Sequence, residues 1–266
     1  MASVLFLFLA HLAVGIAASL LLVGQAAGVK FFRFNAGLAA VLLLIALAFR
    51  PDPPAGAPAA AFGFGCLLVA TGALLVYWAT IGRALAALRP LLLWTTALGG
   101  GAALVVQAAG WSVVEAGPSP WLTAASFLSS AALLGGSCTA MILGHWYLVL
   151  PSMDVSLLQR IVKFHIGSTV VRIAVVGAVI AAAMATWQAP SGAGFDRYAL
   201  SIEGVFLWQR VLFGLLGPAV LSYLTWETAK IRSTQSATGI LYVDFFTVIV
   251  GEVLAKYLLI SQRVPL

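Results

Sequence analysis

The sequence predicts an all-α fold, a polytopic transmembrane helix bundle of about eight spans. Of its 266 residues, 62% are hydrophobic and only 8% are charged, whereas soluble globular chains carry about 25% charged residues. Apolar runs long enough to cross a bilayer, which takes about 20 residues, recur along the whole chain. A soluble domain has no means of burying so much apolar surface, so the composition excludes one.

Eight apolar runs are candidate spans, and the breaks between them are short and rich in turn-forming residues. The spans are expected near residues 3–24, 35–50, 61–81, 91–110, 121–149, 165–187, 205–226 and 237–260. The first run has no basic segment before it and is long enough to span, so we expect a helix rather than a cleaved signal. No break exceeds about 17 residues. Residues 1–266 therefore form a single integral membrane domain, and any hydrophilic catalytic module would be another chain.

Three of the breaks are marked by proline. Arg50-Pro51-Asp52-Pro53-Pro54 ends the second run, Gly117-Pro118-Ser119-Pro120 opens the fifth, and Ala189-Pro190-Ser191-Gly192 closes the sixth. Aromatic residues typical of membrane–water interfaces stand near the predicted span ends. They are Trp111, Trp121, Trp146, Tyr147, Trp187, Trp208, Tyr223 and Trp226.

The basic residues predict the orientation, because short cytoplasmic loops are enriched in Lys and Arg. One set of flanks holds eight: Lys30, Arg33, Arg83, Arg89, Arg160, Lys163, Lys230 and Arg232. The other set holds Arg50, Arg197 and Arg263. Both termini are therefore expected outside, in a bacterial-type plasma membrane. Because the net charge of +6 is scattered between apolar runs, it does not form a nucleic-acid surface.

Few polar side chains fall inside the predicted spans, and each is expected to have a partner or a task. His145, His165, Arg172 and Asp244 are placed toward the inner face. Arg172 and Asp244 come out at similar depths at the helical rise of about 1.5 Å per residue. We therefore predict an Arg172–Asp244 ion pair. His145, Asp244 and Arg172 are the candidate catalytic residues, because histidines beside a carboxylate suit proton-coupled chemistry.

A second polar group is predicted toward the outer face. Glu252 and Lys256 are four residues apart and share a helix face, and Arg210 falls at about the depth of Glu252. This charge cluster either stabilises the packing of the last two spans or takes part in function. The two cysteines, Cys66 and Cys138, lie inside apolar runs without a metal-binding spacing, so no metal site is expected.

Two cofactors are candidates for these polar residues. A bis-histidine haem b is not favoured, because His11 and His145 differ in depth by about 10 Å; His11 is expected to bond to a neighbouring helix. A quinone fits better, since it needs an apolar slot, two donors and a proton path. His145, Trp146, Tyr147 and His165 are the candidate quinone-binding residues, with Phe164 and Leu148 as further lining.

The last run contains Gly251-Glu252-Val253-Leu254-Ala255-Lys256-Tyr257. It resembles the closing helix of the NrfD/polysulfide-reductase and DMSO-reductase membrane anchor subunits, in which Arg usually stands where Lys256 does. The resemblance covers about one span, and the eight-span count also resembles the DMSO-reductase anchor. It implies an integral membrane subunit that exchanges electrons between quinol and an iron–sulfur or cytochrome partner, and that does so without haem.

Three functions remain open on the sequence. The first is a quinone-handling membrane subunit of a respiratory or other redox complex, with membrane lipid and other subunits as partners. The second is a secondary transporter or small-solute permease, although no inverted repeat is evident. The third is a structural, assembly or haem-b-binding subunit.

Overall fold

The computed structural model describes residues 1–51, 58–111, 119–150, 152–186, 194–202 and 204–266. Its elements are all helical, as the composition predicted. They are α1 (Ala2–Leu20), η1 (Gln25–Ala27), α2 (Gly28–Ala48), α3 (Pro58–Thr80), η2 (Ala86–Leu88), α4 (Arg89–Trp111), α5 (Pro120–Val149), α6 (Ser156–Thr186), α7 (Phe195–Ala199), α8 (Val205–Val211), η3 (Leu212–Leu216), α9 (Gly217–Lys230) and α10 (Thr234–Gln262).

Seven helical stretches among the described residues are long and apolar enough to cross a membrane. They lie at Ala2–Leu20, Gln25–Ala48, Ala59–Thr80, Ala86–Trp111, Pro120–Val149, Ser156–Thr186 and Val205–Lys230. These helices correspond to the first seven predicted runs. The eighth run corresponds to α10, a 29-residue helix that carries Asp244, Glu252 and Lys256.

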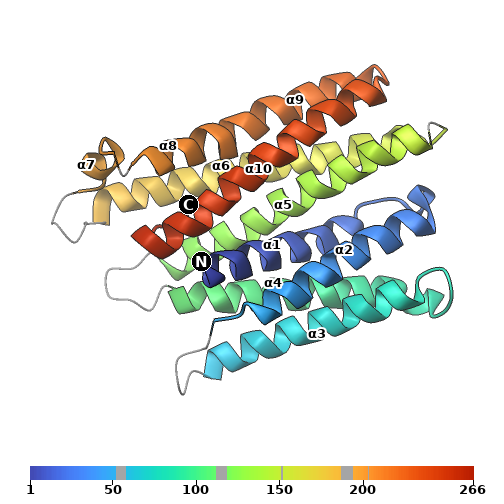
Figure 1. The fold of residues 1–266 in the computed structure, drawn as a ribbon, viewed down its shortest axis with the longest axis horizontal. Coiled ribbons are helices and arrows are strands. Elements are labelled where there is room, and N and C mark those ends of the chain that lie inside the picture. The colour runs from blue at the N-terminus through green and yellow to red at the C-terminus, as the bar shows by residue number, and fades with distance from the viewer. Residues whose placement is uncertain (52–57, 112–118, 151, 187–193, 203) are drawn as a thin grey trace.

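The helices form one elongated bundle with α5 near its centre (Figure 1). Of the residues in the most apolar stretch of α5, 83% are buried inside the bundle, compared with 28% for α3 at its edge. Large apolar side chains cover the outside of the bundle, as a lipid-facing surface requires. Examples are Phe34, Trp94, Leu98, Val170, Met184 and Phe246, all more than half exposed.

Both labelled termini lie toward the end of the bundle that carries α7 (Figure 1). The eight basic flanking residues belong to the start of α2, the α3–α4 connection, the start of α6 and the end of α9. These segments lie at the opposite end of the bundle from α7. The predicted clustering of positive charge at one end is therefore present in the fold.

Several boundaries differ from the prediction. Helix α6 begins at Ser156 rather than near residue 165, and α2 begins at Gly28 rather than near residue 35. In both cases the first turns contain two basic residues, Lys30 and Arg33 in α2 and Arg160 and Lys163 in α6, so hydropathy alone placed the start too late. Pro120 opens α5 as expected, because proline is favoured in the first helical turn. Trp187 and the predicted break residues 52–54, 117–118 and 189–192 lie outside the described residues.

Two pairs of glycines let helices touch backbone to backbone. A Cβ on Gly15 of α1 would lie 1.9 Å from the carbonyl oxygen of Ala131, and one on Gly135 of α5 would lie 1.9 Å from Gly15. A Cβ on Gly251 of α10 would lie 2.1 Å from Gly214, in the π-helical turn η3. Small residues allow such close packing between membrane helices. The two contacts fix α1 against α5 and α10 against η3.

Candidate functional site

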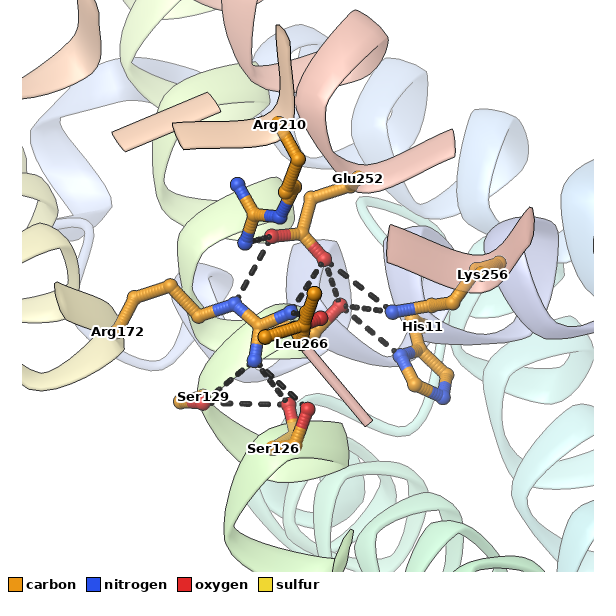
Figure 2. Close-up of polar contacts among 9 residues, drawn as sticks. His11, Ser126, Ser129, Arg172, Arg210, Glu252, Lys256 and Leu266 are labelled. Atoms are coloured by element: carbon orange, nitrogen blue, oxygen red, sulfur yellow. Dashed lines mark hydrogen bonds and ion pairs between the residues drawn. The ribbon is translucent and has the colours of Figure 1, made fainter. Parts of the chain in front are cut away.

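The carboxylate of Glu252 is the centre of a buried polar network. Among the described residues it accepts hydrogen bonds from four side chains, on α5, α6, α8 and α10 (Figure 2). Arg172 donates through Nε at 2.9 Å and through Nη2 at 3.1 Å. Arg210 Nη2 donates at 2.8 Å and Lys256 Nζ at 3.2 Å. The structure brings together Arg210, Glu252 and Lys256, the three residues of the predicted charge cluster, and adds Arg172 to them.

Ser130 connects this network to α1. Its hydroxyl donates to Glu252 Oε2 at 2.5 Å and accepts from Lys256 Nζ at 2.6 Å. His11 Nδ1 lies 3.1 Å from the same hydroxyl. Because a serine hydroxyl has a single proton, and Ser130 donates it to Glu252, His11 is the donor and carries its proton on Nδ1. His11 therefore bonds to a neighbouring helix, as expected from the sequence.

Arg172 has further partners that hold its guanidinium. Its Nη1 donates to the Ser126 carbonyl and hydroxyl, both at 2.9 Å, and to the Ser129 hydroxyl at 3.3 Å. Its Nη2 donates to the backbone carbonyl of Leu266 at 2.8 Å. Leu266 and Val264 are buried against α6, α7 and α8. The segment after α10 therefore folds back and covers one side of the network.

Three basic side chains surround one acidic side chain in this network. The guanidiniums of Arg172 and Arg210 and the amine of Lys256 face the carboxylate of Glu252 within the part of the chain that the structure describes. All four side chains are buried, with at most 3% of any exposed. Nε and Nη1 of Arg210 have no hydrogen-bond partner among these residues. The site is therefore a buried cluster of three basic side chains and one acidic side chain in an apolar bundle.

A second contact between an acidic and a basic side chain lies nearer to the basic end of the bundle. Nε2 of His165 on α6 is 2.7 Å from Oδ2 of Asp244 on α10, and both side chains are fully buried. The two atoms are close but not aligned as a hydrogen bond, and no ring nitrogen of His165 and no carboxylate oxygen of Asp244 has a hydrogen-bond partner among the described residues. A close imidazole–carboxylate pair without competing partners is able to hold or release a proton between its two members.

The predicted Arg172–Asp244 ion pair is wrong. Arg172 pairs with Glu252, and Asp244 pairs with His165. The reason is the true start of α6 at Ser156, because sixteen residues of helix place Arg172 about 24 Å along it. Glu252 lies eighteen residues into α10, about 27 Å along that helix. The two residues therefore match in depth.

The four predicted quinone-binding residues do not form one pocket. His145 is on the outer surface of the bundle, with Nδ1 2.9 Å from the hydroxyl of Tyr242. Tyr242 and Asp244 are two residues apart on α10, so they face different directions. The buried Tyr147 donates to the carbonyl of Asp154. Only His165 joins Asp244.

Trp146 and the two predicted lining residues also separate. Trp146 packs edge-on against Phe31, with ring centroids 5.9 Å apart. Phe164 is partly buried near Gly136 of α5, and Leu148 is 43% exposed. The prediction of one slot lined by these side chains is therefore wrong, since consecutive residues at the end of α5 point to different sides of the helix.

The serines of α5 were missed by the sequence interpretation. Ser126, Ser129 and Ser130 recur at helical spacing in an otherwise apolar helix and supply partners for Arg172, Glu252 and Lys256. Hydroxyls commonly bond across helices in membranes, so their shared face was an available signal. The position of Leu266 had no such signal, because it depends on how the segment after α10 folds back.

The His165–Asp244 contact and the Glu252 network both lie between α6 and α10. His165 and Asp244 form one contact between α6 and α10, and Arg172 and Glu252 form another about two turns further along. The arrangement brings an imidazole–carboxylate pair and a cluster of basic side chains around Glu252 into one bundle. The chain matches no protein-family model, no curated protein and no solved structure.

Proposed function

We propose that this chain is an integral membrane subunit of a redox complex that exchanges protons and electrons with quinone or quinol. The observation that carries the proposal is the buried His165–Asp244 contact of 2.7 Å. Quinone reduction takes up protons and quinol oxidation releases them, and an imidazole–carboxylate pair is suited to that transfer. In this proposal His165 and Asp244 exchange the protons.

The proposed topology has eight spans, with α10 as the last. A 29-residue helix is about 43 Å long, more than the roughly 30 Å of a bilayer core. The charged residues Asp244, Glu252 and Lys256 of α10 face partners on α5, α6 and α8 rather than lipid. The basic end is placed in the cytoplasm and both termini outside, in a bacterial-type plasma membrane.

The resemblance of residues 251–257 to NrfD and DMSO-reductase anchors supports the same proposal. Glu252 and Lys256, which carry that resemblance, are the centre of the buried network. Gly251 gives the close contact with Gly214 that brings Arg210 to Glu252. Partners would bring electrons, through iron–sulfur or cytochrome subunits. Haem b is not part of the proposal, because the three histidines do not face one another: His165 contacts Asp244, His145 lies on the outer surface beside Tyr242, and His11 contacts Ser130.

Purification from native membranes in mild detergent tests this function. We expect iron–sulfur or cytochrome subunits to co-purify, and quinone to be extracted from the complex in a stoichiometric amount. A stable lone chain without quinone would contradict the proposal. A Soret band from this chain alone would contradict the choice against haem.

A permease for small anions is the second candidate. The three basic side chains around Glu252 and the nitrogens of Arg210 that have no partner among the described residues favour it. The same preparation separates the two candidates. A permease would show anion-dependent thermal stabilisation as a lone chain, whereas a redox subunit would retain its partners and quinone.

A further inference from the structure

A groove outside both ionic sites runs along α2 at the basic end of the bundle. We call it the α2 groove; its volume is about 570 Å³, and it lies between α2, α3 and α5. Lys30, Arg33, Trp78 and Trp146 line it near the helix ends, and Phe34 and Val41 line it deeper in the bundle. Its polar and apolar residues are thus separated along the helix axis.

The length of the groove fits an acyl chain. Lys30, Phe34 and Val41 lie on one side of α2, at intervals of four and seven residues. Eleven residues of helix from Lys30 to Val41 cover about 16 Å, close to half of a bilayer core of roughly 30 Å. Phe34 and Val41 are 54% and 53% exposed. An apolar chain parallel to α2 would cover them.

The polar end of the groove offers donors for an anionic headgroup. Lys30 is exposed, and no described acidic residue forms an ion pair with it. Arg33 is held in place because its Nη2 donates to the carbonyl of Ile81, which uses one of five N–H donors. Nε1 of Trp146 is buried and has no partner among the described residues. These groups match a phosphate and the ester oxygens beside it.

We infer that the α2 groove binds one anionic phospholipid, with its phosphate at Lys30 and Arg33 and an acyl chain along Phe34 and Val41. The eight basic flanking residues of this end support the choice, because anionic lipids gather at cytoplasmic positive charge. A neutral quinone would leave both cations without a counter-charge. The inference rests on membrane insertion and on the proposed cytoplasmic side of the basic end, and not on the redox chemistry, so its failure would leave the redox proposal untouched.

Native mass spectrometry of the purified protein with equal amounts of phosphatidylglycerol and phosphatidylcholine tests this site. We expect one phosphatidylglycerol to be retained in preference. Lys30→Ala should lower its retention about fivefold, Lys30→Arg should preserve it, and Trp146→Phe should lower it. Lys163→Ala is the matched control, since Lys163 lies at the same end over the Trp226 ring, 5.0 Å from its centroid and outside the groove.

Four results would overturn the inference. The first is equal retention of both lipids, and the second is wild-type retention of phosphatidylglycerol in Lys30→Ala. The third is recovery of quinone instead of phospholipid. The fourth is binding of inorganic phosphate alone that Lys30→Ala weakens as much as it weakens lipid retention. The last result would assign a free-phosphate site. Because Lys30 is exposed, its substitution leaves the folded bundle intact for each measurement.

Discussion

Arg172 and Glu252 meet in a two-pronged contact between α6 and α10. Nε and Nη2 of the guanidinium each approach a different carboxylate oxygen, at 2.9 and 3.1 Å. Paired charge-assisted hydrogen bonds of this kind are strong and fix orientation. Arg210, Lys256 and Ser130 donate hydrogen bonds to the same carboxylate. Glu252 therefore links α5, α6, α8 and α10, and the contact between His11 and Ser130 connects α1 to them.

Glu252→Gln should destabilise the bundle severely. The substitution leaves Arg172, Arg210 and Lys256 buried around a neutral amide, and breaking a buried ion pair costs about 3–5 kcal/mol. Thermal unfolding of the detergent-solubilised protein measures the loss. Glu227→Gln is the control, because the Glu227–Lys230 pair is 42–46% exposed and such pairs contribute less than about 1 kcal/mol. Equal melting temperatures for the two variants would refute the role of Glu252.

A double-mutant cycle distinguishes the observed pairs from the predicted one. Arg172→Gln and Glu252→Gln should show a coupling energy above about 1 kcal/mol, because the residues are in contact. Arg172→Gln and Asp244→Asn should be additive within about 0.5 kcal/mol, since Asp244 lies about 12 Å from Glu252 along α10. The measurement is the free energy of unfolding of each single and double variant. Strong coupling of Arg172 to Asp244 would place them in contact after all.

Gly15→Ala should weaken the packing of α1 on α5. The new methyl group would lie 1.9 Å from the carbonyl oxygen of Ala131, which neither backbone is able to accommodate without a shift. We expect a lower melting temperature and loss of the His11–Ser130 contact. Gly72→Ala in α3 is the control, because nothing lies within 4 Å of its Cβ position and alanine favours a helix over glycine. If both variants melt alike, the close approach of α1 and α5 is wrong.

Asp154, in the connection between α5 and α6, should titrate below its usual pH. The backbone N–H of Ser156 donates to it at 3.0 Å and the Ser156 hydroxyl at 2.8 Å. These two bonds, followed by the charge of Arg232, lower the pKa of Asp154. A lowered pKa means that the ionised form stabilises the fold above the unfolded pKa, and this contribution disappears as the pH falls through the folded pKa. Carboxyl NMR of the wild type and of Ser156→Ala measures the pKa of Asp154, and we expect a higher pKa in the variant. An unchanged pKa would contradict a role for the Ser156 hydroxyl.

The sequence predicted the helical class, the basic end and the group of Arg210, Glu252 and Lys256, because composition and helical spacing determine them. It missed the partners of Arg172 and Asp244 because depth was counted from the first apolar residue of each run. Helix α6 begins nine residues before His165, and its first turns hold Gln159, Arg160 and Lys163. The facing direction of His145, Trp146 and Tyr147 depends on tertiary packing, which spacing alone does not specify.

The rate of quinol oxidation or quinone reduction by the complex that purifies with this chain tests the central proposal most directly. Asp244→Asn keeps the shape of the side chain but prevents proton exchange with His165, and general acid–base groups contribute at least about 100-fold to rate. We predict a loss of about that size in the assembled complex, and a similar loss in His165→Gln. Asp154→Asn, at an exposed carboxylate, should retain the wild-type rate. Wild-type turnover in both assembled Asp244→Asn and His165→Gln complexes would contradict the account.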